Sequence, residues 1–201
     1  MLIDLHTHTC PKSADSGLSL EVLLTTGRRK GLDGVCLTEH NSVWGRGDVT
    51  GLAERYGISV FRGMEVSTDI GHVLVFGIER YTTEMSEVYR LAHIVEEEDG
   101  AMILAHPWRE DNGVPGWPDV SELFDAVEVI NGCDSKVSSA YWVYMVSAMG
   151  ICTTAGSDAH SAGAIGSCAT KFEIPVRDDL ELVRAIKSCK YRPVWLDGPY
   201  L

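Results

Sequence analysis

The sequence lacks any apolar run long enough to cross a membrane, and it lacks the start of a secretory signal. A membrane helix needs about 20 apolar residues, and no stretch of the 201 residues approaches that length. The apolar opening is interrupted by Asp4 and ends at His6, so the apolar segment of a signal peptide is missing. We therefore expect a cytoplasmic protein that does not bind membranes.

Cysteine pairs with metal-binding spacing are also missing. The six cysteines are scattered, and none forms a Cys-x-x-Cys pair, which argues against a zinc ribbon or a thioredoxin-like motif. Because no export signal is present, we expect reduced thiols. Cys36, Cys152 and Cys168 lie in apolar runs and are expected to be small core residues.

Positive charge is scarce. The chain has 17 lysines and arginines against 29 aspartates and glutamates, for a formal net charge of −12. Long nucleic acids bind to basic surfaces, so we expect no stable binding of this kind. A small phosphorylated substrate or a short nucleic acid end remains compatible, because bound cations would cancel negative charge locally. Oligomeric state is not indicated.

Short apolar runs alternate with longer amphipathic segments along the whole chain. This alternation predicts a parallel sheet with helices outside it, and the length predicts a single domain, residues 1–201. The Pro- and Gly-rich residues 112–118 are predicted to form a loop over the site. The predicted strands are 1–5, 34–38, 58–61, 73–77, 101–105, 126–130, 151–155 and 168–172, and the predicted helices are 20–30, 49–56, 84–99, 137–149 and 180–188.

Polar side chains recur just after the predicted strands, where an α/β barrel carries its active site. His6 and His8 are two residues apart on a strand, so both imidazoles can reach one ion. Taken alone, this pair is equally compatible with ordinary polar residues at a strand end. The same kind of placement recurs at His40, Glu65, His106, Asp158 and His160. Acidic side chains are rarely buried without partners, so the repetition favours a metal site.

These motifs together resemble those of the PHP family, named for its polymerase-associated and histidinol-phosphatase relatives. More narrowly, the chain resembles small stand-alone members described as predicted metal-dependent phosphoesterases or exonucleases, and the resemblance extends from Asp4 to about Val194. The resemblance implies a distorted seven-stranded β/α barrel that holds two or three divalent ions (Zn, Mn or Fe). It is carried by Asp4-Leu5-His6-Thr7-His8-Thr9, Thr38-Glu39-His40-Asn41, Gly63-Met64-Glu65, Ala105-His106-Pro107 and Gly156-Ser157-Asp158-Ala159-His160-Ser161.

The resemblance also implies three groups of metal ligands. The first is His6, His8, Glu65 and Asp158. Glu65 would bridge to a second ion, which His106 and His72 would also hold. The third group is Asp15, His40 and His160.

Two of these positions depart from the expected pattern. Relatives usually show Ser-Asp-Gly where this chain has Ser-Ala-Asp-Ser-Gly, so Asp15 has a turn or helix-cap aspartate as its alternative. His72 precedes a predicted strand instead of following one, and its alternative is a polar residue at a strand edge.

The ligand set predicts hydrolysis of a phosphate mono- or diester by a metal-activated hydroxide in a di- or trinuclear site. Asp158, His160 and His40 are the expected catalytic residues. Arg109 follows Ala105-His106-Pro107-Trp108 and would bind phosphate, although a solvated arginine is the alternative. Asn131 ends a predicted strand and is expected to contact substrate or to support a ligand.

Two other functions are compatible with the sequence. One is a non-catalytic metal-binding or regulatory module, although most ligands are present. The other is amidohydrolase-like cleavage of a C–N bond, since those barrels also open with a His-x-His pair. They generally use a bridging lysine, however, and no lysine ends a predicted strand here.

Overall fold

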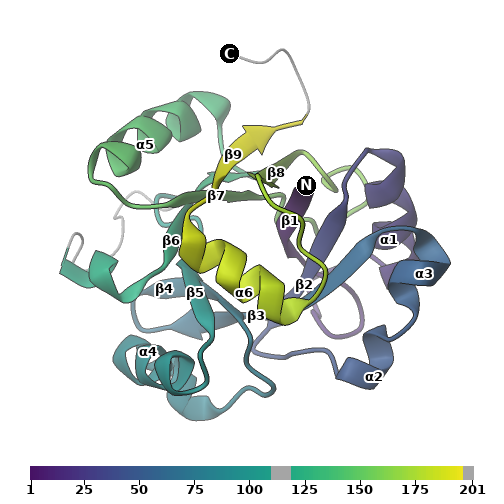
Figure 1. The fold of residues 1–201 in the computed structure, drawn as a ribbon, viewed down its shortest axis with the longest axis horizontal. Coiled ribbons are helices and arrows are strands. Elements are labelled where there is room, and N and C mark those ends of the chain that lie inside the picture. Colours follow the sequence, from purple (N-terminus) through teal and green to yellow (C-terminus); the bar gives the residue numbers. More distant parts are fainter. Residues whose placement is uncertain (110–118, 197–201) are drawn as a thin grey trace.

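The computed structural model describes residues 1–109 and 119–196. Its strands form one sheet in the order β7-β6-β5-β4-β3-β2-β1-β8-β9, with helices around it (Figure 1). The strands are β1 (Leu2–Thr7), β2 (Gly34–His40), β3 (Ser59–Thr68), β4 (Gly71–Phe76), β5 (Ala101–Leu104), β6 (Ala126–Asn131), β7 (Thr153–Gly156), β8 (Cys168–Phe172) and β9 (Tyr191–Trp195). The α-helices are α1 (Leu20–Arg29), α2 (Arg46–Val49), α3 (Leu52–Tyr56), α4 (Val88–Glu97), α5 (Lys136–Ala148) and α6 (Asp179–Ser188), and two 3₁₀ turns are η1 (Thr83–Ser86) and η2 (Asp119–Leu123).

The sheet is mixed, which corrects the prediction of a parallel sheet. Strands β1, β2 and β3 are parallel, as are β5, β6 and β7. Strand β4 runs antiparallel to both β3 and β5, and β8 runs antiparallel to β1 and β9. The turn between β3 and β4 contains only Asp69 and Ile70. A connection this short joins antiparallel strands, since a parallel crossover needs a dozen residues or more.

The end strand β7 of the mixed sheet curves round to lie near β1, which gives the predicted α/β barrel-like fold. Beyond β7, the backbone N–H of Asp158 donates to the carbonyl of His6 at 2.8 Å, and His8 donates to the carbonyl of Ala159 at 3.1 Å. The segment after β7 therefore lies beside the end of β1. The barrel-like class is confirmed, but the described residues form nine strands, where the resemblance implied seven.

Several predicted elements are shorter or longer than expected. Ser19 caps α1, with its side chain accepting from the N–H of Val22. The predicted helix 84–99 is divided, because Glu87 adopts an extended conformation between η1 and α4. The predicted strand 58–61 is the start of the much longer β3. The predicted loop 112–118 lies outside the described residues.

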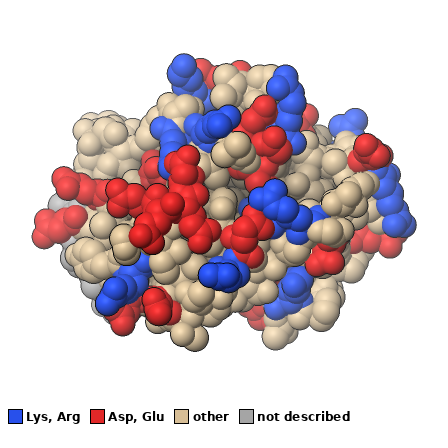
Figure 2. Space-filling view, turned by 60° about the horizontal axis from the view of Figure 1, so that its bottom comes forward, with Lys and Arg blue, Asp and Glu red and all other residues tan. Residues whose placement is uncertain are grey.

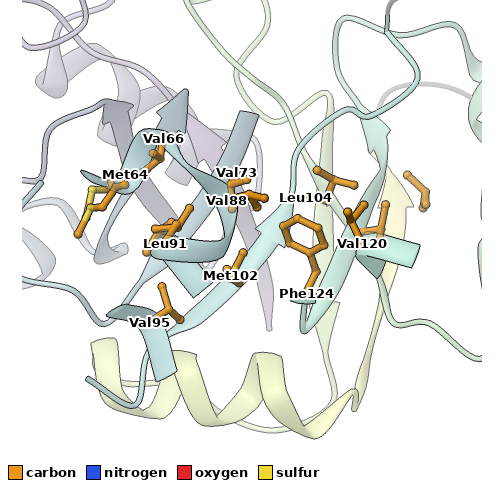
Figure 3. Close-up of a cluster of buried hydrophobic side chains, with 14 of the residues drawn as sticks. Met64, Val66, Val73, Val88, Leu91, Val95, Met102, Leu104, Val120 and Phe124 are labelled. Carbon is orange, nitrogen blue, oxygen red and sulfur yellow. The ribbon is translucent and has the colours of Figure 1, made fainter. Parts of the chain in front are cut away.

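The helices bury the outer faces of the sheet and one end of the barrel. Helix α4 packs Val88, Leu91 and Val95 against side chains of β3, β4 and β5 (Figure 3). Helix α6 packs Leu182 and Ile186 among Phe61, Phe76 and other apolar residues of the strands. Because Phe61 lies near the start of β3 and Phe76 ends the antiparallel β4, α6 closes the end of the barrel opposite to the polar strand ends.

Two cysteines contradict the expectation of reduced thiols. Cys152, just before β7, forms a disulfide with Cys189, which follows α6, and their Cα atoms are 5.7 Å apart. Cys36 and Cys168 are free and buried, as expected of small core residues. Among the described residues, no helix has both the length and the apolar character needed to span a membrane.

Candidate metal centre

Six of the seven histidines gather at the open end of the barrel, around the carboxylate of Glu65. Glu65 lies inside β3, where it was predicted to follow a strand, and its side chain is 1 % exposed. The remaining histidine, His93, is exposed on α4. The gathered histidines are His6, His8, His40, His72, His106 and His160.

The first predicted ligand group converges on one point. Nε2 of His6 lies 3.3 Å from Oε2 of Glu65 and 3.5 Å from Oδ1 of Asp158. Nε2 of His8 lies 3.1 Å and 3.3 Å from the same two oxygens. All four side chains are buried. Two imidazole nitrogens and two carboxylate oxygens thus surround a single small volume.

The atoms facing this volume fit a divalent cation. Within the described residues, His6 Nε2, His8 Nε2 and Glu65 Oε2 are buried and lack a hydrogen-bond partner. Leaving such atoms unpaired costs about 1–3 kcal/mol each, and a cation removes that cost by accepting their lone pairs. Imidazole nitrogen and carboxylate oxygen are the ligands of Zn, Mn and Fe. In the part of the chain that the structure describes, no lysine or arginine pairs with these three atoms to take the place of a metal.

The second group shares Glu65 with the first. Its Oε1 lies 2.8 Å from Nδ1 of His72 and 3.1 Å from Nε2 of His106. His72 occupies the second position of β4, and the antiparallel register places it opposite Ser67 of β3. The β3–β4 hairpin therefore brings His72 to the polar end of the barrel, although it starts a strand instead of ending one.

The third group lies nearer to solvent. Oδ2 of Asp15 is 3.1 Å from Nε2 of both His40 and His160. The Asp15 side chain is 56 % exposed, and it joins two imidazoles despite the extra residue in its motif. His40 also places Nδ1 3.0 Å from Oε2 of Glu65. The structure thus brings all nine predicted metal-ligating side chains into one cluster.

Three residues at the polar strand ends have a left-handed backbone although none is glycine. These are Asn41 (φ 48°), His106 (φ 28°) and Asp158 (φ 51°). Such conformations are strained and persist where surrounding contacts hold them. Here each backbone N–H donates within the site: Asn41 to the Glu65 carbonyl, His106 to the Glu128 carboxylate and Asp158 to the His6 carbonyl.

The charges of the cluster shift its pKa values in opposite directions. Burial alone would raise the pKa of Glu65, but the charge of His6 and the hydrogen bond between His106 and Oε1 hold that pKa well below its usual range. The pKa of Asp158 is likewise lowered by His6, His8 and Arg109 against the effect of burial. Burial favours a neutral His6, yet Glu128, Asp158 and Glu65 raise its pKa. The carboxylates are thus ionised and ready to bind cations.

The two predicted substrate-binding residues contact each other beside Asp158. Nη2 of Arg109 donates to Oδ1 of Asn131 and to Oδ2 of Asp158, both at 2.6 Å. Arg109 is 36 % exposed, whereas Asn131 is buried at the end of β6. The guanidinium therefore reaches from solvent to the edge of the first ligand group.

Sequence reasoning missed two buried acids behind the ligands, Glu39 and Glu128. Glu128 lies in the middle of the apolar strand β6 and Glu39 precedes His40 in β2, and both side chains are buried. A charged residue within an otherwise buried strand was the available signal, because such residues are rarely buried without partners.

This geometry defines a class of protein: an α/β barrel whose polar end carries a cluster of histidines and carboxylates suited to divalent cations. Residues 4–138 match the family model for the PHP domain, and residues 144–191 match the model described as PHP-associated. The first match alone covers more than half of the chain. The chain belongs to the PHP family.

The chain is also similar to a curated relative in sequence and to solved structures in fold. Uncharacterized protein MJ1587 of Methanocaldococcus jannaschii is 25 % identical over 140 residues, which cover 65 % of this chain and 82 % of the relative. PsfC from Pseudomonas syringae shares the fold with a TM-score of 0.72 and 20 % identity, over 96 % of this chain and 91 % of that one.

Two further solved structures share the fold. One is a two-domain protein from Bacteroides vulgatus that contains a predicted PHP-like metal-dependent phosphoesterase, with a TM-score of 0.78 and 18 % identity. The match covers 97 % of this chain and 64 % of that protein. The other is an amidohydrolase from Chromobacterium violaceum with bound sulfate and no metal, with a TM-score of 0.63, 15 % identity and 98 % of each chain covered.

Proposed function

We propose that this chain is a metal-dependent phosphoesterase that hydrolyses a phosphate mono- or diester. The substrate would be a nucleotide, the end of a short oligonucleotide or a small phosphorylated metabolite. One observation carries the proposal: the buried Glu65 carboxylate lies within 3.3 Å of five imidazoles, three at one oxygen and two at the other. A carboxylate in this position suits a bridge between two cations, and paired cations suit in-line attack on phosphorus.

The chain's own residues have distinct proposed roles. Bound divalent cations would supply Lewis-acid stabilisation of the phosphoryl oxygens and would acidify a water molecule. Arg109 would bind a phosphate oxygen through its exposed guanidinium, and Asn131 holds that guanidinium in place. His40 and His160, with side chains 28 % and 30 % exposed, would hold or pass a proton at the solvent edge.

The overall charge supports a small substrate. On the face drawn in Figure 2, Asp and Glu side chains gather in a broad patch with Lys and Arg side chains around it. With a formal net charge of −12, the chain repels a long polyanion at a distance. A short phosphate ester is attracted locally, because cations at Glu65 and the Arg109 side chain would offset the acidic surface there.

The test is a panel of substrates offered to the chain loaded separately with Mn, Zn and Fe. We expect hydrolysis of p-nitrophenyl phosphate or its bis-ester, of nucleotides or of short oligonucleotides, and loss of that activity with a chelator. The variant Glu65→Gln should lose both bound metal and activity, whereas His93→Ala alters an exposed histidine outside the cluster and should keep both. A metal-loaded chain inert toward the whole panel contradicts the proposal.

Two outcomes of the same experiment would support other functions. The likeness to an amidohydrolase makes C–N hydrolysis the second candidate, so N-acyl and cyclic amide substrates belong in the panel. Bound metal without any turnover, together with a co-purifying protein, would instead indicate a non-catalytic module.

A further inference from the structure

Two buried carboxylates outside the proposed ligand set stand behind His6 of β1 and His8, which follows that strand. Glu128 places Oε1 and Oε2 at 3.1 Å and 3.3 Å from Nδ1 of His6. Glu39 reaches His8 indirectly, through the hydroxyl of Ser13. The Nε2 atoms of His6 and His8 converge in the first ligand group. Both acids act on the other imidazole nitrogen, Nδ1, which faces away from that group.

Among the described residues, the other hydrogen-bond partners of the Glu128 carboxylate are donors. Its Oε2 accepts from the backbone N–H of His106 at 3.1 Å and from Nδ2 of Asn131 at 2.9 Å. An ionised carboxylate has no proton to donate, so its contact with His6 requires a proton on Nδ1. The lone pair of that imidazole then lies on Nε2, the atom directed at Glu65 and Asp158. Glu128 also holds His106 in its left-handed backbone conformation.

Glu39 favours the same tautomer of His8, with the proton on Nδ1, but acts through the Ser13 hydroxyl between them. The Ser13 hydroxyl donates to Oε2 of Glu39 at 2.6 Å. A hydroxyl carries one proton, so the Ser13 oxygen is left to accept from Nδ1 of His8 at 3.2 Å. The rest of the Glu39 carboxylate accepts from the backbone N–H of Thr9 at 2.9 Å and from Nε1 of Trp44 at 2.8 Å.

We propose that Glu128 and Glu39 are positioning residues that keep the proton on Nδ1 of His6 and His8, so that both Nε2 lone pairs face the shared cation. This inference rests on the proposed metal-dependent function and extends it to residues outside the ligand set. Acceptors of this kind fix the ring orientation of a ligating histidine and raise its basicity, and losing one typically lowers metal affinity about 10–100-fold.

Glu128→Gln tests the first half of the proposal. The glutamine oxygen satisfies the most donors where it faces His106 and Asn131, which turns its NH₂ group toward His6. Nδ1 of His6 must then accept, and its proton moves to Nε2, where it blocks the lone pair. We expect zinc affinity, measured by competition with a chelator, to fall about 10–100-fold. In imidazole ¹⁵N NMR of the metal-free protein, the Nδ1–H signal of His6 should disappear and an Nε2–H signal should replace it.

Ser13→Ala tests the second half with a smaller change, since it removes one oxygen and leaves Glu39 in place. We expect the Nδ1–H signal of His8 to weaken and zinc affinity to fall. Glu97→Gln is the matched control, because that carboxylate is 65 % exposed on α4. Circular dichroism and thermal unfolding establish whether each variant folds. If Glu128→Gln does not fold, an Nδ1–H signal of His6 in the unaltered chain supports the first half and its absence overturns it, while Ser13→Ala tests the second half.

The two proposals fail in different ways. Variants that bind zinc as tightly as the unaltered chain, with unchanged Nδ1–H signals, overturn the positioning roles while leaving hydrolysis untouched. An unaltered chain that binds zinc and shows these signals but hydrolyses nothing overturns the phosphoesterase proposal alone.

Discussion

Gly156, the last residue of β7, has no room for a side chain. An added Cβ would collide with His6 and would lie 2.7 Å from Oε1 of Glu128. We expect Gly156→Ala to displace His6, to abolish metal binding and to lower the free energy of unfolding by about 1–3 kcal/mol through overpacking. Metal analysis of the purified variant and denaturant unfolding measure the two effects.

A second glycine provides the comparison. Gly163 has nothing within 4 Å of the position that a Cβ would take, and its φ is not positive. Gly163→Ala should therefore keep full metal content and stability. Equal metal content in both alanine variants would show that Gly156 does not support the site.

At the scale of single residues, the sequence predicted the polar cluster but not its supports. The histidines and acids of the ligand set stand in short recognisable motifs, and the structure places all of them together. Glu128 was not predicted because it lies among apolar strand residues, and Glu39 was not predicted because it stands beside the more recognisable His40; only the folded barrel shows which donors surround them. His72 reaches the site through an antiparallel hairpin, which local spacing does not reveal.

At the scale of elements, α4 stabilises the barrel without contacting the metal centre. Leu91 is fully buried between α4 and the sheet, so we expect Leu91→Ala to lower the free energy of unfolding by about 2–5 kcal/mol. Metal content per folded molecule should not change. Tyr89→Ala, at a side chain 66 % exposed on the same helix, should have little effect, and equal losses of stability in the two variants would contradict this account.

An ion-pair network joins elements at the closed end of the barrel. Arg62 of β3 contacts Glu79, which follows β4, and Asp179, which begins α6. Hydrogen bonds from Arg62 and Arg46 lower the pKa of Glu79 to about 2. Since the unfolded chain takes up the proton at about pH 4.5, the stabilisation by Glu79 is complete above that pH and is lost as the pH falls toward about 2.

The variant Glu79→Gln tests whether this stabilisation is lost as the pH falls. The difference in free energy of unfolding between the unaltered chain and the variant should be greatest near neutral pH and should shrink below about pH 4.5. The side chain is 48 % exposed, so solvent screening keeps the effect modest. Denaturant unfolding at several pH values provides the measurement, and a difference that stays constant down to about pH 3 would show that the pair does not contribute in this way.

Helices and strands with a strong local hydrophobic pattern were predicted correctly. Those that form only by pairing with a distant strand were missed. The apolar run of β6 and the amphipathic α6 were predicted to within one residue of their observed ends. Strand β9 was not predicted: it contains Pro193, which is confined to sheet edges, and it forms by pairing with β8. The direction of β4 likewise depends on its hairpin and not on its own residues.

At the scale of the whole molecule, binding of metal should stabilise the fold. The ligands come from strands spread across the sheet, from β1 to the segment after β7, and meet only in the folded chain. A ligand that binds only the folded state stabilises it by about 2.7 kcal/mol at 100 times its dissociation constant. We expect added Mn or Zn to raise the melting temperature and a chelator to reverse the rise, with no such response in Glu65→Gln. A melting temperature indifferent to metal in the unaltered chain would contradict this expectation.

The disulfide shows what whole-chain reasoning from sequence missed. Cys152 and Cys189 are 37 residues apart and share no motif, and their proximity depends on where α6 ends against β7.

The net charge was informative in a different way, because it bears on the partners of the molecule and not on its fold.

The central claim is that Glu65 is the common ligand of a multinuclear metal centre. The most direct measurement is anomalous X-ray scattering from crystals of the chain grown with Mn or Zn. The account predicts two or three ions around Glu65, with both of its carboxylate oxygens bound and with Nε2 of His6 and His8 directed at one shared ion. Ions bound elsewhere, or a Glu65 carboxylate that contacts none, would contradict it.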